Sequence, residues 1–298
     1  MKARFAVLSL LVLVSFEAQA DLPGWAGPMQ SVMLGVISVS EAMNAATYDP
    51  VVDFKKGDVY VGGSVARYKV DPLYDESSVA KVSGDFNGTG GGFMLAYGLS
   101  DRWMVSLLRT NFGFDGQGQG QSTGSCGSCV PWSVQLDHAG IEHIEAVGAY
   151  KFQWNSVSLP VYFGVTQEQY SIDAVTVQSG TTVRATADGT SRGLVAGIAA
   201  SFPIGAYFDL APYFRGTNFQ GFQVNARIPG TNTQATGAFS DNGGYGIIGL
   251  KVGARVTKDF RASLDLGSYL RSLDSVNQIW MKGTKIQNSA ALTLNYRF

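Results

Sequence analysis

The last residues of the chain alternate between apolar and polar positions. In residues 290–298, which read AALTLNYRF, an apolar side chain holds every second position up to Phe298. A repeat of two places successive side chains on opposite faces of a strand. The segment is therefore predicted to be a β-strand with one apolar face.

The same repeat recurs upstream between turns of two kinds. Further alternating segments cover 59–65, 93–99, 103–107, 143–152, 157–165, 194–202, 208–214, 248–256 and 260–271. Tight turns are expected at 100–102, 154–156, 203–205 and 257–259, and long polar loops at 70–88, 114–138, 170–190, 218–243 and 272–287. Short turns that alternate with long loops are typical of a transmembrane barrel.

These patterns predict an all-β fold for residues 58–298, a transmembrane antiparallel up-and-down β-barrel of about ten strands. Twelve strands are the alternative, if residues 276–286 hide a further hairpin. An even number of strands leaves both ends of the barrel on the same side of the membrane.

Residues 1–20 have the three parts of a secretory signal peptide. Lys2 and Arg4 precede an apolar run, and Ala18-Gln19-Ala20 supplies the small residues that a signal peptidase requires. The alternative, an uncleaved anchor, would need about twenty apolar residues. Cleavage after Ala20 and export from the cytoplasm are therefore expected.

The composition narrows the choice of partners. Charged residues make up only 15% of the chain, which holds 37 Gly, 13 Tyr and 17 Phe. The 22 basic and 23 acidic residues become 20 and 22 once Lys2, Arg4 and Glu17 are removed, a net charge of −2. That charge argues against nucleic acid as a partner. The composition fits a barrel that faces lipid, although a secreted β-sandwich would share it.

Residues 21–57 are predicted to be an N-terminal segment that contains a short amphipathic helix before the barrel. The apolar residues Met29, Val32, Met33, Val36, Ile37 and Met43 follow helical spacing. Three placements compete: a foot at the membrane surface, a plug in the lumen, and a cover across the periplasmic mouth. The helix has no Lys or Arg to hold lipid headgroups, which favours the plug or the cover.

The terminal strand resembles that of the outer-membrane barrel proteins of Gram-negative bacteria. In that family the last strand ends in Phe, preceded by alternating apolar or aromatic residues, as Tyr296 and Phe298 do here. The resemblance implies that the barrel-assembly machinery reads this strand, and that the barrel lies in the outer membrane among lipid and lipopolysaccharide. An aromatic girdle is expected beside the short turns, at Trp103, Tyr150, Phe152, Phe202, Phe208, Phe260, Tyr296 and Phe298.

Cys126 and Cys129 form a CGSC motif in a loop rich in Gly, Gln and Ser. A metal or redox centre is one reading, but only His138 and His143 could add imidazole ligands. In an oxidising compartment, a small disulfide is the simpler prediction. No cofactor is expected.

His143 and Glu145 share the polar face of one predicted strand. They could serve general acid–base chemistry, yet they match no motif of outer-membrane phospholipases, deacylases or omptin-type proteases. The glycine runs at 88–92 and 116–121 do not lie between a strand and a helix, so they are not phosphate loops. The chain is therefore not expected to be an enzyme.

The lumen is predicted to be lined by charged side chains. The inward set comprises Glu145, Lys151, Glu168, Asp209, Arg215, Lys251, Arg255, Arg261, Asp265, Arg271 and Arg297. Asp209 and Asp265 are expected to pair with Arg255 and Arg261, because these residues come from neighbouring strands. The excess of cations favours a narrow channel for small polar or anionic solutes. The alternative functions are a closed structural, anchoring or surface-recognition barrel that acts through its long loops, and, more remotely, a membrane-embedded enzyme.

Overall fold

The computed structural model describes residues 43–49, 54–70, 80–122, 130–178, 180–230, 234–239, 243–272 and 286–298. The strands are β1 (Val59–Val70), β2 (Ala80–Gly98), β3 (Trp103–Ser122), β4 (Val130–Trp154), β5 (Val157–Gln178), β6 (Thr181–Ala199), β7 (Phe202–Ile204), β8 (Phe208–Arg227), β9 (Gln234–Phe239), β10 (Gly243–Arg255), β11 (Phe260–Ser272) and β12 (Ile286–Arg297). Residues 43–47 form a short helix.

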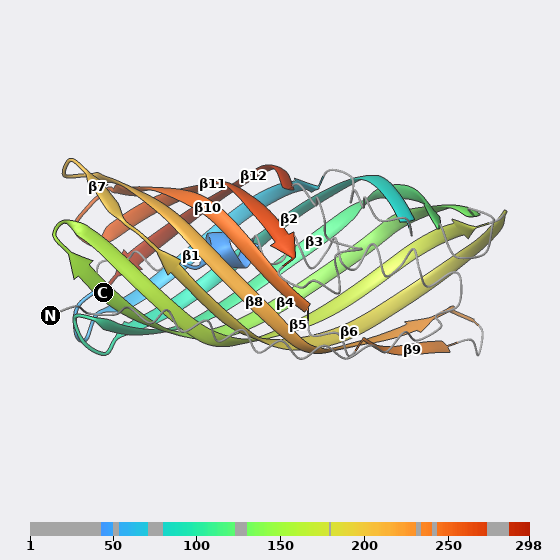
Figure 1. Ribbon diagram of the computed structural model, residues 1–298, viewed down its shortest axis with the longest axis horizontal. Coiled ribbons are helices and arrows are strands. Elements are labelled where there is room, and N and C mark those ends of the chain that lie inside the picture. Colours follow the sequence, from blue (N-terminus) through green and yellow to red (C-terminus); the bar gives the residue numbers. More distant parts are fainter. Residues whose placement is uncertain are drawn as a thin grey trace, which may run out of the picture.

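The strands close into an antiparallel barrel (Figure 1). Neighbours in the chain pair with one another, and β1 closes the ring on β12, with Val61 opposite Tyr296. The short strand β7 pairs with the start of β8, and β9 pairs with the far end of β8. Neither of them adds a further strand to the ring, because β6 and β10 are the neighbours of β8 in the wall. The predicted barrel of ten strands is therefore confirmed.

Tight turns gather at the end of the barrel that also holds Phe298 (Figure 1). Between β4 and β5 only Asn155 and Ser156 connect Trp154 to its partner Val157, and Asn155 takes a φ of 54°. Asn tolerates this left-handed backbone better than most residues do. Gly205, with a φ of 66°, has the same role between β7 and β8. This end is the periplasmic end of an outer-membrane barrel.

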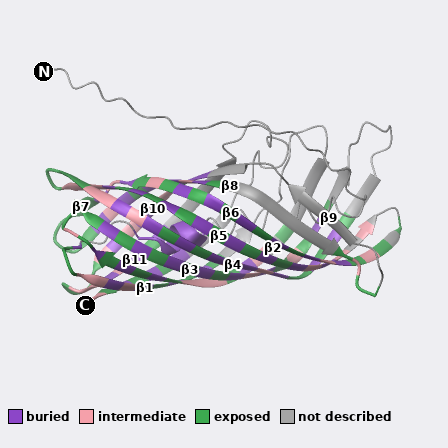
Figure 2. Cartoon of the chain, turned by 90° about the horizontal axis from the view of Figure 1, so that it is seen from below, coloured by how far each residue is buried: buried purple, intermediate pink, exposed green. Residues whose placement is uncertain are grey.

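An apolar band surrounds the outside of the barrel, and exposed and buried residues alternate along each strand (Figure 2). On β4 the outward side chains from Ile144 to Phe152 are apolar, a length close to the roughly 9–11 residues that a tilted strand needs to cross a bilayer. The next outward residue, Glu142, pairs with Arg109 of β3 at 2.6 Å. This ion pair marks the outer edge of the band.

The predicted aromatic girdle lies on the outside near the short turns, as expected. Trp103, Phe152, Phe202, Phe208, Tyr296 and Phe298 are exposed, and Tyr150 and Phe260 are half-buried. Neighbouring rings contact each other edge to face, with centroids 4.9 Å apart for Trp103–Tyr150 and 4.7 Å apart for Tyr296–Phe298.

Above the band, the strands continue through segments that the sequence analysis assigned to loops. The loops predicted at 114–138 and 170–190 were wrong over most of their length, because β3 runs to Ser122 and β4 begins at Val130, and β5 runs to Gln178 and β6 begins at Thr181. The alternation of inward and outward side chains continues here, but large apolar residues now point inward: Phe112 and Phe114 are buried inside the barrel, whereas Leu107 of the same strand faces outward. An apolar interior with a polar exterior suits a barrel that stands in water.

Residues 43–49 lie inside the barrel, where Figure 1 shows the helix surrounded by strands. Every side chain from Met43 to Asp49 is at most 3% exposed. Among the described residues, no helix is both long and apolar enough to cross a membrane.

Candidate functional site

The segment Met43–Asp49, called the plug from here on, fills the lumen at the level of the apolar band. Its backbone is fixed locally, since Tyr48 N–H donates to the Asn44 carbonyl at 3.0 Å and the Thr47 hydroxyl donates to the Met43 carbonyl at 2.9 Å. Met43 is the last of the six apolar residues that predicted the amphipathic helix, and the other five lie outside the described residues. Of the three predicted placements, these residues therefore take the one inside the lumen.

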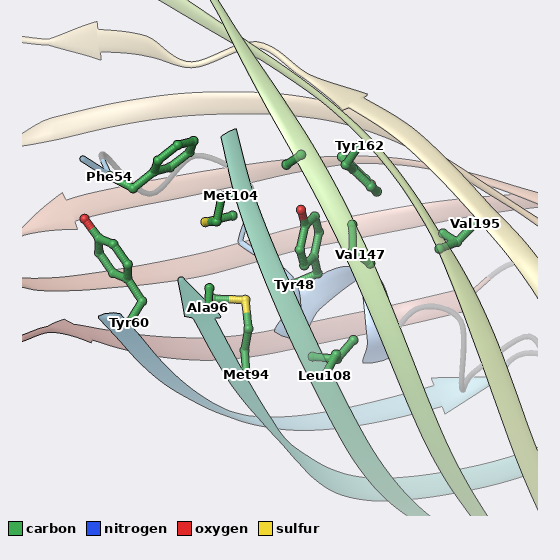
Figure 3. Packing of buried hydrophobic residues seen from close by; sticks show 11 residues of the cluster. Tyr48, Phe54, Tyr60, Met94, Ala96, Met104, Leu108, Val147, Tyr162 and Val195 are labelled. Carbon is green, nitrogen blue, oxygen red and sulfur yellow. The ribbon is translucent and has the colours of Figure 1, made fainter. Parts of the chain in front are cut away.

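One side of the plug packs against apolar side chains of the wall (Figure 3). Tyr48 lies among Met94, Leu108 and Val147, and its ring centroid is 4.7 Å from that of Tyr162. These inward residues show that the wall is not uniformly polar, because an occupied lumen forms a core as a globular domain does.

The Gly92 position lets the plug approach the wall closely. A Cβ atom added there would lie 2.5 Å from the Thr47 hydroxyl oxygen, too close for van der Waals contact. The same Thr47 hydroxyl lies 2.6 Å from the hydroxyl of Ser64 of β1, the residue that pairs with Gly92. Glycine in β2 thus leaves room for the helix against the sheet.

The outer end of the plug joins a buried cluster of polar groups on β3, β4 and β5. The Asn44 side chain accepts a hydrogen bond from the Thr110 hydroxyl at 2.5 Å and donates to Glu168 at 3.5 Å. Glu168 also accepts a hydrogen bond from Tyr170, whose oxygen lies 2.7 Å from the Ser191 hydroxyl. Polar groups removed from water must find such partners.

His143 lies between two glutamates in this cluster. Its Nδ1 atom is 2.8 Å from Glu168 and its Nε2 atom is 3.0 Å from Glu145. Arg215 of β8 forms a two-pronged ion pair with Glu145, at 2.9 and 2.5 Å. All four side chains are almost fully buried, so substrate access to the imidazole is blocked while the plug is in place.

The inner end of the plug is held by a second buried cluster. Asp49 forms an ion pair with Arg261 of β11 and accepts a hydrogen bond from the Asn295 amide at 3.0 Å. Arg261 also reaches Asp209 of β8, with the closest N–O distance at 2.6 Å. One guanidinium therefore bridges a carboxylate of the plug and a carboxylate of the wall.

Lys251 links the plug to the same side of the wall. Its ammonium group donates to the Ala46 carbonyl at 2.7 Å and lies 3.4 Å from the Asp265 carboxylate. The Thr293 hydroxyl donates to the same carbonyl at 2.9 Å, and Asp265 accepts from the Tyr213 hydroxyl at 2.9 Å. The last turn of a helix leaves carbonyls without partners in the helix, and here the wall supplies the donors.

The predicted lumen residues divide into two groups. Those buried around the plug are Glu145, Glu168, Asp209, Arg215, Lys251, Arg261 and Asp265. Lys151 and Arg297 are partly exposed near the periplasmic rim, Arg255 is exposed there, and the Arg271 side chain lies outside the described residues. The Arg261–Asp209 pair was predicted correctly. The pairing of Asp265 with an arginine was wrong, because Lys251 of the adjacent strand is nearer.

Sequence reasoning missed the plug residues that contact the wall. Asn44 and Thr47 are polar residues of a helix of which only the apolar side was recognised, and Asp49 follows that helix. Asn295 was seen only as part of the polar face of the last strand. The signal that could have found them is the polar face itself: a helix inside a charged lumen needs hydrogen-bonding groups.

The described residues hold no group of three or more His, Cys, Asp or Glu side chains placed to bind a metal ion. Cys126 and Cys129, the predicted disulfide, lie outside the described residues, so that pairing stays a prediction.

Comparison with solved structures finds outer-membrane barrels. The outer membrane protease OmpT from Escherichia coli is 13% identical, with a TM-score of 0.57, and the match covers 83% of this chain and 99% of that one. The translocator domain of the autotransporter NalP from Neisseria meningitidis is 11% identical, with a TM-score of 0.48, covering 90% and 98%. The outer membrane protein OprG from Pseudomonas aeruginosa is 12% identical, with a TM-score of 0.39, covering 82% and 97%.

Neither the protein-family models nor the curated protein sequences include a match to this chain. The similarity to OmpT, at this low identity, establishes a shared fold, the closed outer-membrane β-barrel.

Proposed function

We propose that this protein, a multi-pass β-barrel of the Gram-negative outer membrane, is a narrow channel for small polar solutes that the plug closes. The single observation that supports this function is the chemistry of the wall around the plug. Charged side chains from β4, β5, β8, β10 and β11 face the plug and are buried by it.

A permanently closed barrel would have no need of such a wall. Replacing buried ion pairs by apolar side chains of similar volume is often neutral or stabilising by about 1–4 kcal/mol. Here Glu145, Arg215, Lys251 and Arg261 lie instead around a helix of the same chain. If the plug leaves, the exposed wall is one that water can wet.

The wall at the level of the plug selects for polarity more than for the sign of charge. Arg215, Lys251 and Arg261 are opposed there by carboxylates at hydrogen-bonding distance. Removal of the plug takes Asp49 away and leaves Arg261 with Asp209 alone. A preference for anions would therefore come mainly from Lys151 and Arg255 at the periplasmic mouth.

Single-channel conductance in a planar bilayer tests this function. A variant that lacks residues 21–49 is expected to conduct steadily, and the full chain is expected to conduct rarely, because the plug obstructs the lumen. The control for purification and refolding is the outward substitution Gly63→Ala, because an added Cβ atom there has no neighbour closer than 3.9 Å. This variant is expected to conduct as the full chain does. Silence of the correctly folded deletion variant would reject the channel.

In this proposal the buried cluster around His143 holds the plug in the lumen and catalyses no reaction. His143 and Glu145 stabilise the closed state through Arg215 and Glu168. We also propose that the barrel-assembly machinery recognises the terminal strand with Tyr296 and Phe298. The assembled barrel would then contact lipid and lipopolysaccharide in the outer membrane.

A second candidate function is recognition at the cell surface. It is favoured by the strands that continue above the apolar band, such as β4 with 25 residues and β5 with 22. On this extension Arg184 forms ion pairs with Asp173 at 2.7 Å and Asp137 at 3.4 Å. The hydrogen bonds to Asp173 raise the pKa of the Arg184 guanidinium, so this group stays charged and the ion pairs persist at neutral pH.

A further inference from the structure

The inner end of the plug places a carboxylate on a patch of the wall that consists of hydrogen-bond donors. The Asp49 carboxylate forms an ion pair with Arg261. It also accepts hydrogen bonds from the Asn295 amide at 3.0 Å and from the Ser263 hydroxyl at 3.4 Å. Arg261 and Ser263 lie on β11, and Asn295 lies opposite Arg261 on β12. All three donors are buried, so the wall binds Asp49 as it would bind the carboxylate of a free ligand.

The orientation of the Arg261 guanidinium does not depend on the plug. Its Nε and Nη2 atoms donate to the two carboxylate oxygens of Asp209, at 3.3 and 2.6 Å, and its Nη1 atom contacts Asp49. The pair with Asp209 belongs to the wall and remains when Asp49 leaves. Because a preorganised donor loses little conformational freedom on binding, the Nη1 group is ready for another carboxylate.

The Asn295 side chain supports the same interpretation. Its amide nitrogen donates to Asp49, whereas its Oδ1 atom accepts no hydrogen bond within the described part of the chain. A buried polar atom without a partner is unfavourable and needs an explanation. The donor that this asparagine presents to Asp49 supplies one.

A second acceptor of the plug is bound by the same strands and by β10. Lys251 and Thr293 donate to the Ala46 carbonyl, at 2.7 and 2.9 Å, and Thr293 lies opposite Ser263 in the sheet. On this side of the lumen the plug therefore supplies acceptors and the wall supplies donors.

Net charge does not explain this arrangement. The cations Arg261 and Lys251 are opposed by the wall carboxylates Asp209 and Asp265, at 2.6 and 3.4 Å. Recognition of a carboxylate here comes from donors that converge on one point, which discriminates by shape and direction as well as by charge.

We propose that the patch formed by Arg261, Ser263 and Asn295 binds the carboxylate of a small organic acid, and that Asp49 occupies it as an internal ligand while the plug is in place. Asp49 is fully buried, so an acid binds only after the plug has left. A ligand that binds one of two states shifts the equilibrium toward that state. Small organic acids therefore open the barrel. This inference rests on the proposed channel, in which the plug can leave the lumen.

Single-channel recording of the full chain in acetate tests the site. Acetate replaces chloride at constant ionic strength and pH, and acetamide is the neutral molecule of similar shape. At twice the dissociation constant of acetate, the ratio of open to closed channels is expected to be about three times that in chloride alone. Acetamide is expected to leave the ratio unchanged, because it has no charge to pair with Arg261.

Asn295→Ala removes one donor of the site. The acetate concentration needed for the same shift is expected to rise about tenfold, because hydrogen bonds to a charged group are strong. The matched control is Asn111→Ala, on the exposed face of β3, which should respond to acetate as the full chain does. Ser263→Ala should shift the response in the same direction by less, and it replaces Asn295→Ala if that variant does not fold.

Thiol labelling follows the same equilibrium without conductance. Thr47 is fully buried, so Thr47→Cys, combined with Cys126→Ser and Cys129→Ser, reacts with a maleimide only while the plug is out of the lumen. Acetate at twice its dissociation constant is expected to raise the labelling rate by the same factor of about three.

The two measurements separate the site from the channel. Labelling that accelerates with acetate in a barrel that never conducts would support the site and reject the channel. Labelling and openings that do not depend on acetate would overturn the site, and openings alone would still support the channel. An equal loss of the acetate response in Asn295→Ala and Asn111→Ala would also overturn the site, because the response would then not come from this patch.

Discussion

Arg261 shows how a single side chain couples the plug to the barrel. It is 7% exposed and contacts Asp49 of the plug and Asp209 of the wall. Burying a guanidinium is costly unless carboxylates and further hydrogen bonds surround it. The Asn295 and Ser263 side chains supply such hydrogen bonds to Asp49, at 3.0 and 3.4 Å.

Replacing Arg261 by Met should therefore lower the free energy of unfolding by about 3–5 kcal/mol, because two buried carboxylates lose their partner. Urea unfolding of the protein in lipid vesicles measures the change. Asp49→Asn in the same background should recover part of the loss, since it removes one of the stranded charges. The exposed Lys258→Met serves as control, with an expected change within about 0.5 kcal/mol. If Arg261→Met were as stable as the control Lys258→Met, the proposed coupling would be contradicted.

At this scale, the sequence predicted which wall residues point inward but not what they contact. Alternation assigns a face to Asp209 and Arg261, and their adjacency on neighbouring strands suggested a pair. Asp49 could not be placed in the same way, because no period relates a residue before the first strand to a position on the eleventh.

At the scale of elements, β3 contains two environments within one strand. Trp103, Val105 and Leu107 face outward and are exposed, whereas Phe112 and Phe114 face inward and are buried. The alternation has not slipped; the apolar residues have moved to the other face. A strand that leaves the membrane exchanges lipid for water on its outside, and the preferred polarity of that face reverses.

This reversal explains why the fold was predicted better inside the membrane than above it. A search for outward apolar residues stops at Leu107, and the glycines and glutamines from Gly116 to Gln121 then resemble a loop. The inward Phe112 and Phe114 were the available signal that the strand continues. Alternation at 172–174 on β5 gives the same signal, with Ile172 and Ala174 buried.

Phe112→Ala tests whether the extension is a packed barrel. The side chain is 2% exposed, and its loss should lower the free energy of unfolding by about 3–5 kcal/mol. Asn111→Ala, at the adjacent exposed position, should change stability by less than about 0.5 kcal/mol. Both values come from chemical denaturation of the folded protein. A Phe112→Ala effect as small as that of the control would mean that the inner face of the extension contributes no packing.

At the scale of the whole molecule, three layers follow one another along the barrel axis. The periplasmic mouth holds the short turns, the membrane level holds the plug, and the extension stands above the Arg109–Glu142 pair. The sequence predicted the barrel, its number of strands and its short turns. It left the position of the helix open among three placements, because amphipathicity shows that a helix has an apolar side but not which surface covers it.

The central claim, that the plug closes a wettable lumen, is tested most directly by locking the plug to the wall. Thr47 and Ser64 have hydroxyl oxygens 2.6 Å apart, so Thr47→Cys with Ser64→Cys should form a disulfide. Cys126→Ser and Cys129→Ser remove the other thiols, and Thr47→Cys alone is the control.

Single-channel conductance is then recorded before and after reduction. The account predicts that the oxidised double-cysteine protein is silent, that reduction restores opening events, and that the single-cysteine control does not respond. Equal conductance in the oxidised and reduced states would contradict it, because the solute path would then bypass the plug.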